Sequence, residues 1–277
     1  MKLQYLGTAT AEGIPAIFCE CENCKKARIA SGKNIRTRSQ ALIDDRILID
    51  FPADTYMHFL KYDIPLAKVT TCLITHSHSD HLYPQELEMR KKGFSHLKNQ
   101  IPLTFFADVS GFDSISSVKV ANNIADDEIA VRKIKPFESF EVDGYEITAL
   151  RATHDPASSS VVYLIKKDGK TIFYSNDTGE YSSESMNYLE KVKKPIDLIS
   201  LDCTHACSDT TFMGHLTLNR CVVLRKKLLD IGAADKNTVF VLNHFSHNGR
   251  YVIYEEFVKI AAEYGFEVSY DGRIIEV

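Results

Sequence analysis

The feature that most constrains this chain is a short polar segment directly after the apolar run at residues 72–74. Residues 76–81 read HSHSDH, which places three imidazoles and one carboxylate within six positions. These side chains are the ligands expected at a catalytic site for Zn, Mn or Fe. Histidines at i and i+2 project to one side of an extended turn, so two of them can bind one cation. A chance run of exposed histidines is the alternative, and the dense spacing favours a metal site at the end of a strand.

Length and charge narrow the classes of protein. The chain has 277 residues and a net charge of −4. This length suits one large α/β domain, and we expect residues 1–277 to form one. The charge gives no basic field for bulk nucleic-acid binding. The first residues lack the apolar core of a signal peptide, and no apolar run is long enough to cross a bilayer. We therefore expect a cytoplasmic protein without a membrane partner.

Strand-like and helical patterns alternate along the chain, most regularly in its second half, and no linker separates the halves. Strands are expected at residues 3–6, 39–43, 46–50, 71–75, 103–107, 129–134, 145–149, 160–165, 171–174, 198–201, 239–242 and 274–277. Helices are expected at residues 55–61, 84–92, 183–191, 217–229 and 251–264. This pattern predicts two packed sheets with helices outside.

Further ligand candidates stand just past strand-like runs. His154, Asp177 and His244 each hold such a position, and Asp50 ends another run. Functional groups concentrate where strands end in loops. A lone histidine there is more often structural, but together these residues complete two coordination spheres. Asp50 either orients a ligand from behind or is a simple turn carboxylate.

The expected ligands divide between two divalent cations. The first cation is expected to bind His76, His78 and His154. The second is expected to bind Asp80, His81 and His244. Asp177 bridges them, because one carboxylate can span cations roughly 3.5–4 Å apart. Two such cations stabilise a bridging hydroxide near neutral pH, and this hydroxide is the expected nucleophile.

The ordered set from Asp50 to His244 resembles the metallo-β-lactamase superfamily. The resemblance implies an α/β fold, a four-layer αββα sandwich with a dinuclear site at one edge of the sheets. Members of the superfamily hydrolyse lactams, thioesters and phosphodiesters, and a few carry out redox chemistry. An aspartate at Asp177 is similar to the phosphodiesterase and glyoxalase branches. Pro52 stands where the superfamily often has glycine, so we expect a different loop there.

A cysteine cluster indicates a second metal. Cys19, Cys21 and Cys24 form Cys-x-Cys-x-x-Cys, and the chain has seven cysteines, an odd number that argues against a complete disulfide framework. Three thiolates can hold a structural Zn with a fourth ligand from elsewhere, and His247 is the best candidate. We expect this site in a loop inserted near residues 19–24. Free cysteines or a redox pair are the alternatives.

The segments 6–8, 13–15 and 36–39, taken with these cysteines, resemble the phosphoribosyl cyclic phosphodiesterase branch of the carbon–phosphorus lyase pathway. The resemblance implies two catalytic divalent metals, Zn or Mn, and one structural Zn that His247 completes. The pyrroloquinoline quinone biosynthesis protein of the superfamily has a similar cysteine cluster. It generally lacks the full histidine set, which disfavours that branch.

A candidate proton donor precedes the helix expected at 217–229. His215 follows Gly214 in a turn where free backbone N–H groups attract anions. An imidazole there can protonate a departing alkoxide, a step worth about 10²–10⁴-fold, and the resemblance implies the same role. A capping histidine is the alternative, and His205 is a weaker rival. Arg36 and Arg38 are candidate ligands for a substrate phosphate.

The leading hypothesis is a metal-dependent phosphodiesterase with Asp80 and His215 as catalytic residues. The expected substrate is a small cyclic phosphodiester, such as a ribose cyclic phosphate or a 2′,3′-cyclic nucleotide. A thioester or lactone hydrolase on the same metals and a non-hydrolytic cofactor-biosynthesis protein are the alternatives. A tRNA-processing nuclease also fits the metals, but the chain shows no long basic arm. Homodimers are common among superfamily relatives, so a second copy is a possible partner.

Overall fold

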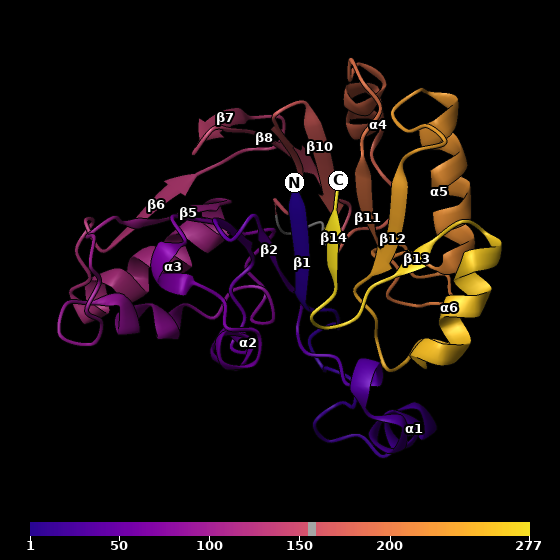
Figure 1. Ribbon diagram of the computed structural model, residues 1–277, viewed down its shortest axis with the longest axis horizontal. Coiled ribbons are helices and arrows are strands. Elements are labelled where there is room, and N and C mark those ends of the chain that lie inside the picture. Colours follow the sequence, from indigo (N-terminus) through magenta and orange to yellow (C-terminus); the bar gives the residue numbers. More distant parts are fainter. Residues whose placement is uncertain (155–158) are drawn as a thin grey trace.

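A computed structural model describes residues 1–154 and 159–277 of the chain. Its first sheet has seven strands in the order β14-β1-β2-β3-β4-β5-β6 (Figure 1). These strands are β1 (Lys2–Gly7), β2 (Gln40–Ile43), β3 (Ile47–Ile49), β4 (Thr71–Leu73), β5 (Leu103–Ala107), β6 (Ile129–Lys133) and β14 (Ile274–Glu276). The two termini lie side by side, since the Met1 amino group donates to the Val277 carbonyl at 2.6 Å.

The second sheet also has seven strands, in the order β13-β12-β11-β10-β9-β8-β7. They are β7 (Ser139–Val142), β8 (Tyr145–Arg151), β9 (Val161–Lys167), β10 (Lys170–Ser175), β11 (Leu198–Asp202), β12 (Val239–Asn243) and β13 (Glu267–Val268). The short strands β7 and β13 were not expected from the sequence; each is a weakly apolar edge strand.

The helices lie outside the two sheets. They are α1 (Glu22–Ala30), α2 (Thr55–Tyr62), α3 (Val109–Asn122), α4 (Ser183–Glu190), α5 (Leu218–Asp230) and α6 (Tyr254–Glu263), with 3₁₀ turns η1 (Gly32–Asn34), η2 (Leu66–Lys68) and η3 (Pro84–Arg90). Figure 1 shows α2 and α3 beside the first sheet and α4, α5 and α6 beside the second.

Apolar side chains form a core at each of the three boundaries between layers. Ile49 and Phe106 of the first sheet pack with Tyr163 and Ile172 of the second in the central core. The other two cores lie beneath the helices, one around Leu224 and the other around the first sheet. The predicted αββα sandwich is confirmed, whereas the prediction of a single domain stays a prediction.

One expected helix takes another form, and one observed helix was not expected from the sequence. The helix expected at 84–92 is the 3₁₀ helix η3. The helix α3 was not predicted because its sequence has no clear apolar stripe. Its buried positions are only Gly111, Ile115 and Lys119. Its start is nevertheless conventional, since the Asp108 side chain accepts a hydrogen bond from the Gly111 amide at 2.8 Å.

Strand direction brings the loops that carry the site to one edge. Strands β3 to β6 run parallel to one another, as do β10 to β13. Strand β8 shares the direction of β10 because both are antiparallel to β9. The sheets are joined close to the end of β4, where the Val161 amide donates to the Thr75 carbonyl at 2.9 Å and the Tyr163 hydroxyl donates to the Ile74 carbonyl at 2.6 Å.

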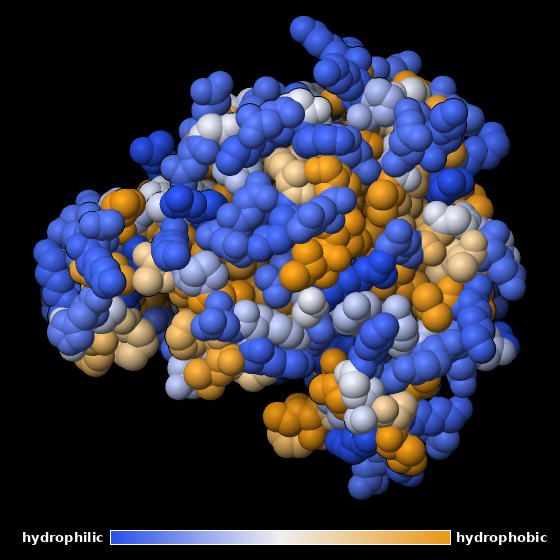
Figure 2. All heavy atoms as spheres, viewed as in Figure 1, coloured by the Kyte–Doolittle hydropathy of each residue, from blue (hydrophilic) through white to orange (hydrophobic). Residues whose placement is uncertain are grey.

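The molecular surface is mostly hydrophilic on the face shown in Figure 2, with hydrophobic atoms across the middle of the face and near the end where α1 lies. The exposed apolar side chains in this part of the chain include Ile17, Phe18 and Ile29. None of the helices in the described ranges combines the length and the apolar character that crossing a membrane requires.

Candidate active site

Backbone strain marks the edge where the strands end. Asp50, Asp177 and His244 follow β3, β10 and β12, and all three are left-handed, with φ of 67°, 59° and 63°. Residues other than glycine adopt this conformation uncommonly, and such positions cluster at functional sites. Each side chain is also buried. The folded structure therefore holds three acidic or imidazole side chains inward at some cost to the backbone.

The first predicted ligand group is brought together. Its ring nitrogens, from His76, His78 and His154, lie within 4.8 Å of one another. His78 Nδ1 is 2.9 Å from His76 Nε2 and 3.3 Å from His154 Nε2. His76 and His78 come from the loop after β4, whereas His154 comes from the loop after β8 in the other sheet.

The second group is Asp80, His81, Asp177 and His244, again with ligand atoms within 4.8 Å of one another. Asp177 Oδ2 lies 2.7 Å from His81 Nε2, 3.6 Å from His244 Nε2 and 3.3 Å from His76 Nε2. The Asp177 carboxylate thus contacts both ligand groups, which is the position expected of a residue that bridges two cations.

Buried polar atoms without hydrogen-bond partners indicate whether the site suits a cation. Among the described residues, His81 Nε2, His244 Nε2 and Asp177 Oδ1 are buried side-chain atoms without a hydrogen-bond partner. Such atoms are costly in a protein interior unless an ion or water satisfies them. Their convergence fits divalent metal ions, and imidazole and carboxylate oxygen are suitable donors.

The charges of the group agree with this fit. Burial lowers the pKa of His76 well below its usual value, which keeps the ring neutral and able to ligate. Burial also opposes a proton on His81, but the carboxylates of Asp80, Asp50 and Asp177 raise its pKa well above the usual value. These carboxylates place negative charge around the ring, which a bound cation would offset.

Asp50 orients the proposed ligand His81 through the ring nitrogen that faces away from Asp177. His81 Nδ1 donates to Asp50 Oδ2 at 2.7 Å, and Asp50 Oδ1 accepts from the Thr75 amide and hydroxyl at 2.8 and 2.9 Å. These bonds fix the ring so that Nε2 faces Asp177. This is the orienting arrangement that metal-binding histidines usually have.

Asp202 is a residue of the site that the sequence analysis missed. It ends β11, is fully buried, and accepts a hydrogen bond from His215 Nδ1 at 2.8 Å. Its other oxygen accepts from the amides of Thr204 and Leu216, both at 3.0 Å. Its place after an apolar strand run was the available signal. The carboxylate outweighs burial and raises the pKa of His215 to about 9.

The cysteine cluster also assembles. The Cys19 and Cys21 Sγ atoms each lie 3.5 Å from His247 Nδ1, and Cys24 completes a group within 4.8 Å. Cys24 lies in helix α1, where the sequence analysis expected a loop. Although burial opposes it, contacts with His247 and the neighbouring thiols lower the pKa of Cys21 to about 6. This favours the thiolate of Cys21, the form that binds zinc, whereas burial raises the pKa of Cys24 to about 11.

Comparison with known proteins agrees with this geometry. The family model described as the beta-lactamase superfamily domain matches residues 45–245, which is more than half of the chain. The chain belongs to this family. The matched region includes the residues of both catalytic ligand groups and Asp202, but not the cysteine cluster or His247. The predicted superfamily is confirmed, and the specific branch stays a proposal.

Solved structures with the same fold span the whole chain. Zinc-bound PqqB from Methylobacterium extorquens is 19% identical, with a TM-score of 0.78 and 100% of both chains covered. A diphosphatase of the PhnP family is 19% identical, with a TM-score of 0.74, covering 100% of this chain and 97% of the other. Human short-form tRNase Z is 18% identical, with a TM-score of 0.64, covering 100% and 99%. No curated protein matches.

Within this superfamily fold, the two arginines predicted to bind phosphate have other partners. Arg36 is 2% exposed, donates from Nη1 to Thr8 Oγ1 and the Ser269 carbonyl, both at 2.8 Å, and stacks on Phe245. The guanidinium of Arg36 is enclosed by the interior of the protein, which disfavours a phosphate-binding role, and that role stays a prediction. Arg38 is partly exposed and pairs with Asp54 at 3.0 Å. Its role stays a prediction.

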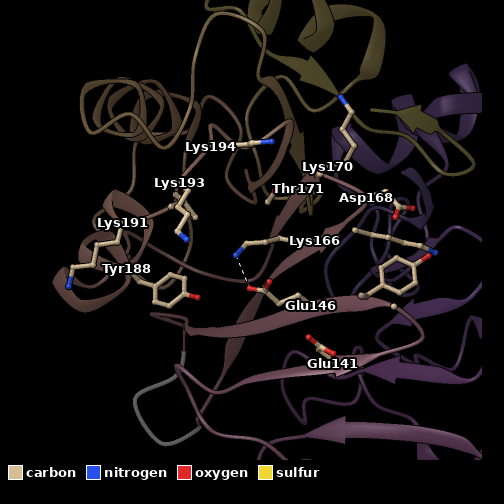
Figure 3. Close-up of a pocket in the computed structure, with 15 residues that line it drawn as sticks. Glu141, Glu146, Lys166, Asp168, Lys170, Thr171, Tyr188, Lys191, Lys193 and Lys194 are labelled. Atoms are coloured by element: carbon tan, nitrogen blue, oxygen red, sulfur yellow. Dashed lines mark hydrogen bonds and ion pairs between the residues drawn. The ribbon is translucent and has the colours of Figure 1, made fainter.

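A separate hollow lies at the far end of the second sheet. It has a volume of about 750 Å³ and is lined by several lysines, including Lys166, Lys193 and Lys194. Figure 3 shows these side chains around the turn between β9 and β10 and the end of α4, with Lys166 paired to Glu146 at 2.8 Å. Lys170 begins β10 and Asp177 follows its end, so this hollow is not part of the metal site.

Proposed function

We propose that this chain is a metal-dependent phosphodiesterase that hydrolyses a small cyclic phosphodiester. A ribose cyclic phosphate or a 2′,3′-cyclic nucleotide is the proposed substrate. The observation that carries the proposal is the position of Asp177. Its Oδ2 contacts both ligand groups, and its Oδ1 lies 3.3 Å from His215 Nδ1. The proposed metals and the proposed proton donor therefore share one small volume.

The proposed cofactors are two catalytic cations, Zn or Mn, and one structural Zn. Two histidine-rich groups that share Asp177 would hold the catalytic pair, and the Cys19, Cys21, Cys24 and His247 group would hold the structural ion. When bound, the catalytic cations activate water and stabilise charge on the phosphoryl oxygens. The phosphoesterases among the similar folds, the diphosphatase and tRNase Z, support this choice of chemistry.

The chain supplies positioning and a proton. Asp80 and Asp177 would hold the cations and offset part of their charge. Asp202 holds His215 through Nδ1, which leaves Nε2 to protonate the leaving oxygen of the opened phosphodiester. An alcohol leaving group costs far less than an alkoxide, and general acids of this kind contribute about 10²–10⁴-fold.

The test is hydrolysis by purified protein loaded with Zn or Mn. Bis-(p-nitrophenyl) phosphate, 2′,3′-cyclic AMP, a thioester and a lactone are offered to the wild type and to Asp80→Ala. We expect cleavage of the phosphodiesters and loss of that activity in the variant. Cleavage of the acyl substrates alone would identify the thioester or lactone hydrolase instead. Metal binding without any hydrolysis would favour the non-hydrolytic alternative, whose fold similarity is to PqqB.

A further inference from the structure

A short loop beside the proposed proton donor carries two exposed apolar side chains. Phe212 and Met213 are 52% and 54% exposed. The Phe212 ring centroid lies 5.8 Å from that of His215 and 6.0 Å from that of His205, which meets it edge-on at 87°. An aromatic ring is thus displayed to solvent next to the imidazole that would meet the leaving group.

This loop is held in place by its own contacts. Arg220 donates from Nη1 to the carbonyls of Phe212 and His215, at 2.5 and 3.1 Å, and from Nη2 to the Thr210 carbonyl at 2.8 Å. One arginine therefore fastens three backbone positions that flank the ring. The same arginine side chain fixes Phe212 and His215 relative to each other.

The ring also rests on a position where the chain has no side chain. A Cβ atom at Gly214 would lie 2.8 Å from Phe212 Cζ and 3.0 Å from the His154 carbonyl oxygen. Glycine at this position lets the ring lie close against the backbone between the metal ligand His154 and His215. Phe212 is accordingly packed along one side and open to solvent on the other.

An exposed aromatic ring that is already fixed is suited to binding a flat group. A group that stacks on this ring causes little further loss of side-chain conformational entropy, so most of the stacking energy contributes to binding. Stacking between bases and aromatic rings is tolerant of base identity because every base has a π-face. The bare sugar of a ribose cyclic phosphate has no planar group to place there.

We propose that Phe212 is a specificity residue that stacks on the base of the substrate, so that the enzyme prefers cyclic nucleotides to cyclic sugar phosphates. This inference rests on the proposed phosphodiesterase function. It narrows the substrate class to molecules in which an aromatic base lies within reach of the ester whose leaving oxygen His215 protonates. Met213 extends the same apolar surface.

The experiment compares a cyclic phosphate that carries a base with one that carries a methoxy group in its place. The full-length, metal-loaded protein is given 2′,3′-cyclic AMP and methyl riboside 2,3-cyclic phosphate, and kcat/KM is measured for each. We expect the wild type to prefer the nucleotide. Phe212→Ala should lower kcat/KM for the nucleotide on the order of 10-fold, mainly through KM, with a much smaller change for the methyl riboside. Phe212→Tyr keeps the ring and should retain the preference.

The controls separate this inference from the proposed function. Tyr264→Ala removes a similarly exposed aromatic ring from the end of α6 and should change neither substrate. If Phe212→Ala lowers both substrates equally, or changes neither, Phe212 is not a base-stacking residue and the inference is wrong. If the wild type cleaves neither substrate, the proposed phosphodiesterase function itself fails. Metal content and circular dichroism at the wild-type level establish that each variant is folded.

Discussion

His215 Nδ1 donates a hydrogen bond of 2.8 Å to the carboxylate of Asp202, which lies at the end of β11. This contact ties the proposed proton donor to the sheet that also positions Asp177 and His244. The same carboxylate oxygen lies 3.4 Å from His244 Nδ1. One buried acid therefore orients both a proposed metal ligand and a proposed general acid.

We expect Asp202→Asn to lower kcat for 2′,3′-cyclic AMP by about 10- to 100-fold at neutral pH, the usual effect of losing such an orienting partner. Activity needs protonated His215 and should fall as pH rises through its pKa, which Asp202 raises to about 9. Removing the negative charge lowers that pKa, so the alkaline limb of the pH–rate profile should move to lower pH.

Asp197→Asn is the matched control for this prediction. Asp197 precedes the same strand at its other end and pairs with Lys170 at 2.9 Å. Its substitution should leave the pH–rate profile unchanged. An alkaline limb that stays in place in Asp202→Asn would show that this carboxylate does not control the proton on His215.

The ligand groups were predictable because each member follows an apolar strand run. Parallel strands bring their carboxyl ends to one edge, so His154, Asp177 and His244 meet although they are far apart in the sequence. Asp202 occupies the same kind of position, but its partner His215 lies across a loop. Only the folded chain shows that the two side chains meet.

Other differences have local physical causes. Arg36 and Arg38 stand two positions apart in a polar segment, yet one is buried against Phe245 and the other is partly exposed. Their shared positive charge could not indicate which of the two would be buried. His58 is a polar residue in the helix α2, yet it is fully buried and bonds to Gln40 and Thr37 at 2.7 Å.

We expect Asp177→Ala to release both catalytic cations, because this carboxylate contacts both ligand groups. Metal analysis should show a fall from about three ions per chain to about one, the proposed structural zinc. Phosphodiesterase activity should be lost with them. Asp230→Ala, at the exposed end of α5, should retain the full metal content. An Asp177→Ala protein that keeps three ions would contradict the proposed bridging role.

We expect Cys24→Ser to remove the structural zinc alone. Cys24 is a buried ligand candidate in α1, so the variant should lose about one ion per chain and become less stable to heat. Asn23 links the same helix to the carbonyls of His247 and Gly249 at 2.8 and 2.9 Å, so proteolysis near residues 16–31 should also quicken. Cys207→Ser, outside this group, is the control. Unchanged metal content in Cys24→Ser would rule out a zinc at these cysteines.

We expect buried His58 to make the protein sensitive to mild acid. Burial lowers the pKa of His58 to about 4, below its usual 6.5. Between these two values the unfolded chain binds a proton that the folded chain does not, so the free energy of unfolding falls as pH falls. The loss amounts to about 3 kcal/mol by pH 4.

His58→Gln keeps a hydrogen-bonding side chain between Gln40 and Thr37 but has no proton to gain. Its free energy of unfolding is expected to fall less than that of the wild type between pH 7 and pH 4, by about the same 3 kcal/mol. Urea titrations of both proteins across this range measure the difference. The change His96→Gln, at an exposed histidine, should follow the wild type. Parallel curves for the wild type and His58→Gln would show that protonation of His58 does not drive the acid sensitivity.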